Sequence, residues 1–108
     1  MVSIETFRQT ALSLPETVEA AHFEKTSFRV KKKIFATLWI AEKKAVLKLS
    51  PVEQSVLIDL DKSIFYPVEG GWGRKGYTIV ELQKVSKKMF KEALQTAWRS
   101  VTPKGGVR

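Results

Sequence analysis

The stretch Phe28-Arg29-Val30-Lys31-Lys32-Lys33-Ile34-Phe35-Ala36 organises the rest of the chain. Two apolar runs, 27–30 and 34–40, flank its three lysines, and such runs are typical of short β-strands. Apolar strands bury their side chains, whereas lysines stay in solvent. The segment therefore predicts a hairpin that presents cations on a rigid base, an arrangement suited to phosphate contacts that do not read base sequence.

Further strands are predicted on either side of this hairpin. The run 34–41 is apolar on both faces apart from Thr37, as expected of a central strand. After a turn at 42–44, a strand over 45–49 places Lys48 on the face opposite Leu47 and Leu49, because side chains alternate along a strand. Two more extended segments are expected, over 64–68 and 77–82.

Three helices are predicted from their caps. Ser3 is a candidate N-cap for a helix that Pro15 ends, and Ser86 is one for the last helix. Ser50-Pro51-Val52-Glu53 has the residues of a capping box and starts a helix that runs to about Leu60. The residues expected to face inward are Ile4, Phe7, Ala11 and Leu14 in the first helix, Val52, Val56, Leu57 and Leu60 in the second, and Met89, Phe90, Ala93, Leu94, Ala97, Trp98 and Val101 in the last.

The chain also resembles a known family. Ser27-Phe28-Arg29-Val30 followed by Lys33-Ile34-Phe35-Ala36 is similar to the signature of the bacterial MmcQ/YjbR-like proteins. Further matches are Leu47-Lys48-Leu49, Glu53-Gln54, Trp72-Gly73, Gly76-Tyr77-Thr78 and Ala97-Trp98-Arg99. The resemblance implies a small α+β domain with a frataxin-like or secretion-chaperone-like layout, in a family described as predicted DNA-binding proteins.

The resemblance bears on two local structures. For residues 17–23, Thr17 and Val18 favour a strand whereas Glu19-Ala20-Ala21 would suit a helix, and the family favours the strand. Relatives often have glycine before the lysine of the hairpin turn, where this chain has Lys31 and Lys32. A tight two-residue turn is therefore not expected, because lysine resists the positive φ that such turns require.

The length of 108 residues and a hydrophobic content of 44% fit one domain. We expect a single two-layer α+β domain over 1–103, with an antiparallel sheet, helices packed on one face, and a flexible tail over 104–108. The chain has no cysteine, no amino-terminal signal and no apolar run of membrane-spanning length, so we expect a cytoplasmic protein without a membrane partner.

A formal net charge of +8 favours a polyanionic partner, although many small proteins are basic for no specific reason. Three basic groups stand out: Arg29 to Lys33, Arg74 with Lys75, and Lys84 to Lys91. Lys87 and Lys88 lie in the first turn of the last helix, where the macrodipole disfavours cations and an anion would relieve them. If all three groups converge, they form a clamp for neighbouring phosphates.

The glycine-rich segment 69–76 is expected to be a loop that carries Trp72, Arg74 and Lys75. Its cations, beside Trp72 and Tyr77, would grip phosphate and stack an exposed base. The alternative is a plain connection whose tryptophan packs into the core.

Nothing in the sequence proposes catalysis. His22 is a lone histidine without a recognisable partner, and Asp59 with Asp61 lacks a third clustered ligand. We therefore expect no enzyme, no catalytic residue, no metal and no cofactor.

The leading hypothesis is a non-enzymatic domain that binds nucleic acid, most simply double-stranded DNA, with low specificity. The expected contact residues are Arg29, Lys31, Lys32, Lys33, Lys48, Trp72, Arg74, Lys75, Lys87 and Lys88. Arg29 would alternatively pair with a carboxylate as a structural residue. The alternative function is a protein-interaction module or homodimer that uses an exposed apolar sheet or helix surface.

Overall fold

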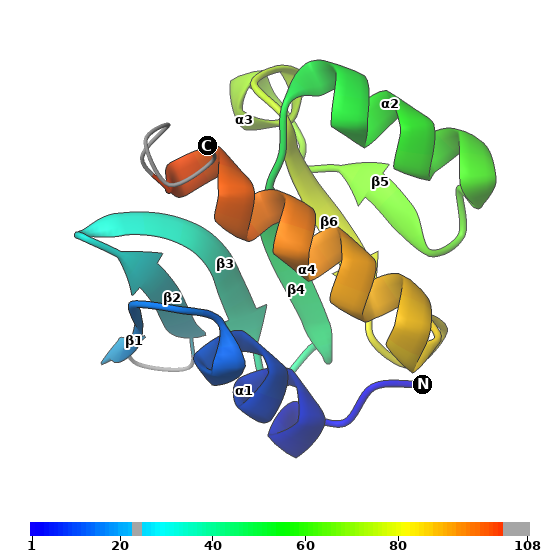
Figure 1. Ribbon diagram of the computed structural model, residues 1–108. Coiled ribbons are helices and arrows are strands. Elements are labelled where there is room, and N and C mark those ends of the chain that lie inside the picture. The colour runs from blue at the N-terminus through cyan, green and yellow to red at the C-terminus, as the bar shows by residue number, and fades with distance from the viewer. Residues whose placement is uncertain (23–24, 103–108) are drawn as a thin grey trace.

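One antiparallel sheet of six strands frames the molecule, which the computed structural model describes over residues 1–22 and 25–102 (Figure 1). Its strands lie side by side in the order β1-β2-β3-β4-β6-β5. In chain order the elements are α1 (Ile4–Ser13), β1 (Thr17–His22), β2 (Lys25–Val30), β3 (Lys33–Trp39), β4 (Lys44–Lys48), α2 (Pro51–Leu60), β5 (Phe65–Pro67), α3 (Gly71–Arg74), β6 (Tyr77–Glu81) and α4 (Lys87–Val101). The predicted α+β class and antiparallel sheet are confirmed.

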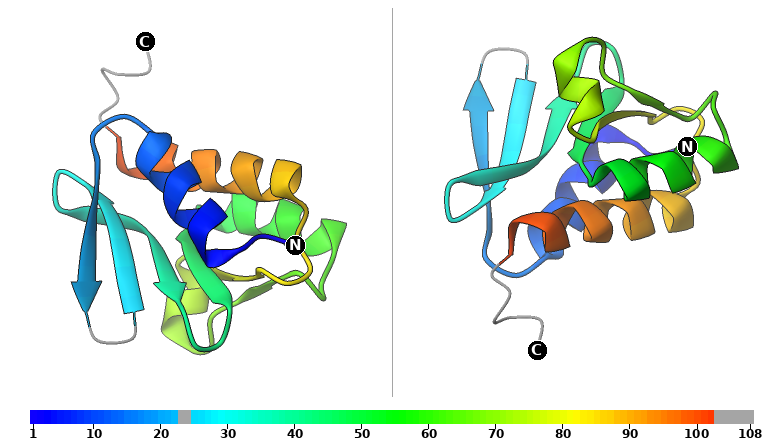
Figure 2. Two further views of the ribbon diagram at one scale, coloured as in Figure 1. Left: turned by 90° about the horizontal axis from the view of Figure 1, so that it is seen from below. Right: turned by 90° about the horizontal axis from the view of Figure 1, so that it is seen from above.

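The helices are divided unequally between the two faces of this sheet. Figure 2 shows α1 and α4 on one side and the short α3 on the other, with α2 beside α4. The core lies under α1 and α4, where the ring of Phe7 is 5.3 Å from that of Phe28 and 5.2 Å from that of Phe90. The face opposite α1 and α4 is therefore left largely without a helical cover.

Strand alternation assigns the residues of β4 to these two faces. Leu47 and Leu49 are fully buried on the helix side, and Lys48 between them is only half-buried on the other side. This confirms the orientation predicted for Lys48. Most strand ends differ from the prediction by one or two residues, as expected when tertiary pairing sets where a strand stops.

The predicted helix caps are present. Ser3, Ser50 and Ser86 each accept a hydrogen bond at Oγ from a backbone N–H of the helix that follows. At α2 the capping box is complete, because the Ser50 N–H also donates to Glu53 Oε1 at 2.9 Å. These signals are local, so the sequence locates the helix starts correctly.

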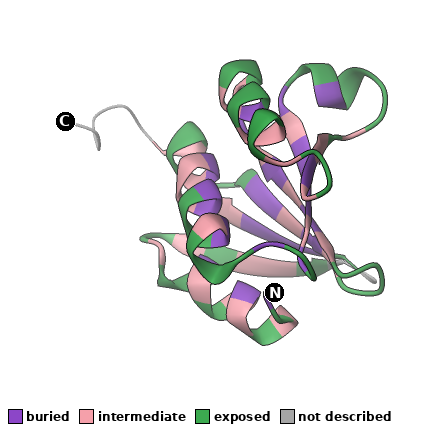
Figure 3. Ribbon diagram, turned by 90° about the vertical axis from the view of Figure 1, so that its right-hand side faces the viewer, coloured by how far each residue is buried: buried purple, intermediate pink, exposed green. Residues whose placement is uncertain are grey.

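The inward face predicted for α2 is largely wrong. Val52, Val56 and Leu60 are 74%, 56% and 61% exposed, whereas Gln54 is buried. In the burial colouring of Figure 3, α2 carries mostly exposed and intermediate residues. The Gln54 side-chain amide donates to the carbonyl oxygens of Gly73, at 3.0 Å, and Tyr77, at 3.2 Å. A buried side-chain amide needs hydrogen-bond partners, and these two acceptors hold the Gln54 side of α2 inward while its valine side is exposed.

The hairpin turn between β2 and β3 also differs from the prediction. Val30 pairs with Lys33, so Lys31 and Lys32 form a tight two-residue turn, with φ of 50° and 74°. Two positive φ values are typical of the primed turns whose twist matches that of the flanking strands. The strand pairing imposes this geometry on residues that disfavour it by about 1–2 kcal/mol each.

The glycine-rich segment is a helical turn rather than a loop. Residues 71–74 form α3, and Gly76 follows with a φ of +107°. A Cβ on Gly76 would lie 1.8 Å from the carbonyl oxygen of Leu49, so the chain passes closer there than any other residue allows. Trp72 is 59% exposed, which excludes the core alternative for this residue.

Some expectations fall outside what the structure describes. Phe23 at the end of the first predicted strand and the tail over 104–108 lie outside the described residues. Within the described ranges, no helix combines the length and the apolar character needed to cross a membrane.

Candidate nucleic-acid interface

The sheet surface opposite α1 and α4, called the open face below, carries aromatic rings and cations from several strands. The pairing register places Trp39 beside Lys44, Val46 beside Ile79, and Lys48 beside Tyr77. The residues of this face used below are Lys25, Ser27, Trp39, Lys44, Val46, Lys48, Tyr66, Tyr77, Ile79 and Glu81. Its chemistry differs sharply from that of the helix-covered face, which is built from phenylalanine, leucine, alanine and valine.

Two of the three predicted basic groups lie at one end of the sheet. The β2–β3 turn, the last residue of β4 and the start of β6 lie at this end, because β3 and β6 both pair antiparallel with β4. Lys48 lies in the register between them, opposite Tyr77. We call this the basic end, and its cations are Arg29, Lys31, Lys32, Lys33, Lys48, Arg74 and Lys75.

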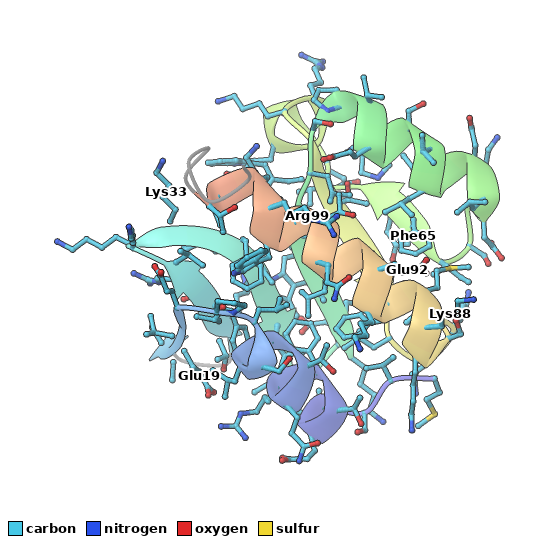
Figure 4. All side chains as sticks on the ribbon, viewed as in Figure 1. Glu19, Lys33, Phe65, Lys88, Glu92 and Arg99 are labelled. Atoms are coloured by element: carbon cyan, nitrogen blue, oxygen red, sulfur yellow. The ribbon has the colours of Figure 1, made fainter. Side chains whose placement is uncertain are left out.

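The third group does not join them. Lys87 and Lys88 begin α4, and the N–H of Lys84 just before them donates to the carbonyl oxygen of Glu81, at the opposite end of β6. Figure 4 shows Lys33 and Lys88 on opposite sides of the molecule. The three basic groups therefore do not form the single clamp considered from the sequence, and Lys87 and Lys88 form a separate patch.

Arg29 is held at the basic end by a neutral partner. Its Nε donates to Ser27 Oγ at 3.0 Å, and Ser27 Oγ donates in turn to the carbonyl oxygen of Ala20. Among the described residues, this hydroxyl rather than a carboxylate is the side-chain partner of Arg29. Its charge remains available to an anion.

Four lysines lie over aromatic rings along the open face and α3. The ammonium nitrogens lie 4.8 Å from the ring centroid of Trp39 for Lys25, 5.8 Å from Tyr66 for Lys44, 5.4 Å from Tyr77 for Lys48 and 5.4 Å from Trp72 for Lys75. Each distance is within cation–π range. The rings of Trp72 and Tyr77 also meet edge to face, with centroids 5.1 Å apart and planes at 85°.

Ion pairs are distributed unevenly among these cations. In the described part of the chain, Arg8 pairs with Glu5 and Glu19, and Lys44 pairs with Glu81 at 3.4 Å. No cation of the basic end takes part in these pairs. This end therefore presents positive charge that carboxylates of the described residues do not neutralise.

Glu81 neutralises the other end of the open face. The Tyr66 hydroxyl donates a short hydrogen bond to Glu81 Oε2, the same oxygen that pairs with Lys44. Burial, followed by the hydrogen bond to Glu81, raises the pKa of Tyr66 above its ordinary value. Lys44, Tyr66 and Glu81 thus form a closed cluster that needs no outside anion.

The sequence left His22 and the pair Asp59 and Asp61 as candidates for catalytic or metal chemistry. His22 ends β1, and its side chain lies outside the described residues. Asp61 Oδ1 accepts hydrogen bonds from Ser63 Oγ at 2.6 Å and Ser63 N at 2.8 Å, which lower the pKa of its carboxyl. Asp61 thus caps the end of α2 with its carboxylate already hydrogen-bonded. The described residues hold no group of three or more acidic, histidine or cysteine side chains placed for a metal ion.

Sequence reasoning missed Lys25 and Trp39. Their residue types carry no signal alone, and only the pairing of Lys25 with Trp39 across β2 and β3 brings the ammonium over the ring. Strand register links residues fourteen positions apart, which local periodicity does not encode. A hairpin register drawn from a tight turn at Lys31 and Lys32 would still have missed the pair, because a bulge between Phe28 and Arg29 shifts the register of β2 and β3 by one residue.

Comparison with protein families identifies the chain. A sequence model described as YjbR matches residues 12–100, which is most of the length. The chain belongs to the YjbR family. This confirms the resemblance drawn from the sequence motifs, while no curated protein matches the chain.

Solved structures share the YjbR fold. A Deinococcus radiodurans protein, DR2400, whose structure is described with a DUF419 domain, is 24% identical with a TM-score of 0.83, over 97% of this chain and 82% of that protein. A Pseudomonas syringae protein is 18% identical with a TM-score of 0.75, over 94% of this chain and all of that one. At these identities the likeness establishes the fold, and the function has to be argued from the surface itself.

Proposed function

We propose that this YjbR-family domain is a non-enzymatic protein that binds DNA with low sequence specificity, through phosphate contacts at the basic end. The observation that carries the proposal is the gathering of cations from β2, the β2–β3 turn, β4 and α3 at one end of the sheet. None of them is in an ion pair within the described residues. Double-stranded DNA presents phosphates densely enough to engage several at once.

The strained turn supports the same proposal. Lys31 and Lys32 are both exposed and both have positive φ, where glycine or asparagine would be more stable. Strain of this kind persists where a side chain is needed at that place, and it is a common feature of functional sites. Here it places two ammonium groups at the tip of a rigid hairpin.

Phosphate contacts make a quantitative prediction. Each phosphate neutralised on a duplex adds about 0.9 to the slope of log affinity against log salt. If four to six of the basic-end cations engage at once, the slope is about −4 to −5. A slope near zero would contradict the proposal.

The test is fluorescence anisotropy of a labelled random duplex, titrated at several salt concentrations with the wild type and with Lys31→Glu/Lys32→Glu/Lys33→Glu. Reversal at the hairpin tip should weaken binding and reduce the slope by about 2 to 3. The matched control is Lys84→Glu/Lys87→Glu/Lys88→Glu, which changes net charge equally at the other end of the sheet. Equal losses in both variants would mean that only the overall charge matters and that the basic end is not the site.

The alternative function, a protein contact, rests on a different surface. The exposed side chains Val52, Val56 and Leu60 line a groove of about 520 Å³ between α2 and α4. The reversal at Lys31, Lys32 and Lys33 leaves this groove untouched, whereas the control reversal changes Lys88, which is part of its lining. Absence of duplex binding at about 50 mM salt, where the phosphate attraction is strong, would therefore remove the DNA proposal and leave the α2–α4 groove as the surface to pursue.

A further inference from the structure

A small hollow on the open face adjoins the basic end. It has a volume of about 260 Å³, and its lining includes Trp39 and Val46 from the sheet, Trp72 from α3 and Tyr77 from β6. Lys25 is also part of the lining. Aromatic rings from three separate elements thus converge on one concavity, although they lie far apart in the chain.

The rings of this hollow are not needed to fill the core. The helix-covered side supplies the buried phenylalanines, whereas Trp72 is 59% exposed on a four-residue helix. Its edge-to-face contact with Tyr77 fixes the tilt of the indole without burying it. An indole held in a defined orientation and left accessible is a stacking platform.

The backbone around Trp72 is built to hold this position. Gln54 anchors α3 from behind through the carbonyl oxygen of Gly73, at 3.0 Å. A Cβ on Gly73 would lie 2.0 Å from the carbonyl oxygen of Val68, so α3 packs directly on the preceding segment. The exposed tryptophan therefore stands on a closely fitted support and not on a loose loop.

Charge and size together select the occupant. Lysines lie over the rings of Trp39, Trp72 and Tyr77, so a ligand that stacks there has ammonium groups beside it for attached anions. The volume is slightly below the roughly 300 Å³ at which pockets begin to hold drug-sized molecules, and fits one planar ring system with its substituents outside. A nucleobase with flanking phosphates has this combination of a flat ring and negative charge.

We infer that the hollow binds an unpaired base of a nucleic-acid strand, stacked on Trp72, while the neighbouring lysines hold the flanking phosphates. The inference rests on the proposed DNA binding and adds that the open face prefers nucleic acid with unpaired bases. A base within a closed duplex is stacked on its neighbours and does not enter the hollow. A strand with unpaired bases therefore binds more tightly than a strand with the same number of phosphates and no bases.

The test compares two labelled strands with equal numbers of phosphates, an oligothymidylate and an abasic strand, by fluorescence anisotropy at one salt concentration. Stacking of one base predicts that the oligothymidylate binds roughly fivefold to 150-fold more tightly. Trp72→Ala should abolish this ratio, while binding of the abasic strand stays unchanged. Leu60→Ala, which alters a side chain of similar exposure on α2, should leave both affinities as in the wild type.

Three outcomes overturn the inference, and the last differs in meaning from the first two. Equal affinities of the wild type for the two strands, or a ratio that survives in Trp72→Ala, would show that no base stacks on Trp72, and phosphate binding at the basic end would stand. Failure of both strands and of the random duplex to bind would remove the proposed function as well. A ratio lost only in Trp72→Ala supports the inference.

Discussion

Lys44 and Lys48 lie on the same strand, on the same face and each over a tyrosine ring, yet their surroundings differ. Lys44, over Tyr66, also pairs with Glu81, which accepts the Tyr66 hydrogen bond. Lys48, over Tyr77, has no carboxylate partner among the described residues, and it lies at the same end of the sheet as the other cations of the basic end. One acidic residue thus separates a self-neutralised end of the open face from an end that attracts anions.

The comparison shows that a lysine–aromatic pair is not by itself a binding feature. At the Glu81 end the pair belongs to a network that satisfies its own charge, as ordinary surface clusters do. At the other end the same pair lies beside α3, the strained lysine turn and the hollow lined by Trp39 and Trp72. Function follows from what surrounds the pair.

The largest expected effect is on stability, and it tests the close packing of the segment that follows Trp72 and α3. In Gly76→Ala the new Cβ would meet the Leu49 carbonyl oxygen at 1.8 Å with φ at +107°, so the chain must shift. We expect the free energy of unfolding to fall by about 2 kcal/mol or more, measured by urea denaturation. Gly71→Ala is the matched control, because a Cβ there meets nothing within 4 Å. Equal stability of the two variants would show that the close approach at Gly76 does not hold this end together.

A smaller effect separates the two lysines directly. Lys48→Ala should weaken duplex binding about fivefold at about 0.1 M salt and reduce the salt slope by about 0.9, because one phosphate contact is lost. Lys44→Ala removes the same charge from the same strand, but its partner is Glu81, and the salt slope should not change. Fluorescence anisotropy titrations of a labelled duplex at several salt concentrations measure the affinity and the salt slope of each variant. Identical salt slopes would remove the distinction between the two ends.

The smallest effect comes from opening the closed cluster. Glu81→Gln keeps the shape of the side chain but frees Lys44 from its ion pair, so we expect duplex affinity to rise less than about threefold and the salt slope to grow by at most about 0.9. The same change should lower the pKa of Tyr66 toward its ordinary value, although burial still holds it above that value. Ultraviolet titration of the tyrosines measures the second effect. A Tyr66 pKa unchanged in Glu81→Gln would show that the carboxylate does not act on the ring.

Local rules predicted much of the fold. The helix starts were located from their capping serines, Ser3, Ser50 and Ser86. The two faces of β4 were assigned from the alternation of Leu47, Lys48 and Leu49. Such signals lie within a few residues of one another, so the sequence displays them directly. The family motifs were also sufficient to identify the YjbR family.

The failures share a cause in contacts between distant segments. The side-chain amide of Gln54 is buried and bonds carbonyl oxygens nineteen and twenty-three residues away, whereas Val52 and Val56 are exposed, against the apolar periodicity of the helix. Lys31 and Lys32 adopt positive φ because the pairing of β2 with β3 requires a tight turn. In both cases tertiary packing overrides a local preference, which for the two lysines is worth about 1–2 kcal/mol each.

The sequence by itself therefore determined the elements other than α3, the α+β class, the family and the identity of the cations. Only the tertiary structure decided that Lys48 joins the hairpin and α3 at one end, that Lys87 and Lys88 lie at the other, and that Trp39 and Trp72 line one hollow. The physical reason is that side-chain periodicity is a property of neighbours in the chain. A binding surface depends instead on strand register and on close packing between segments that the chain keeps far apart.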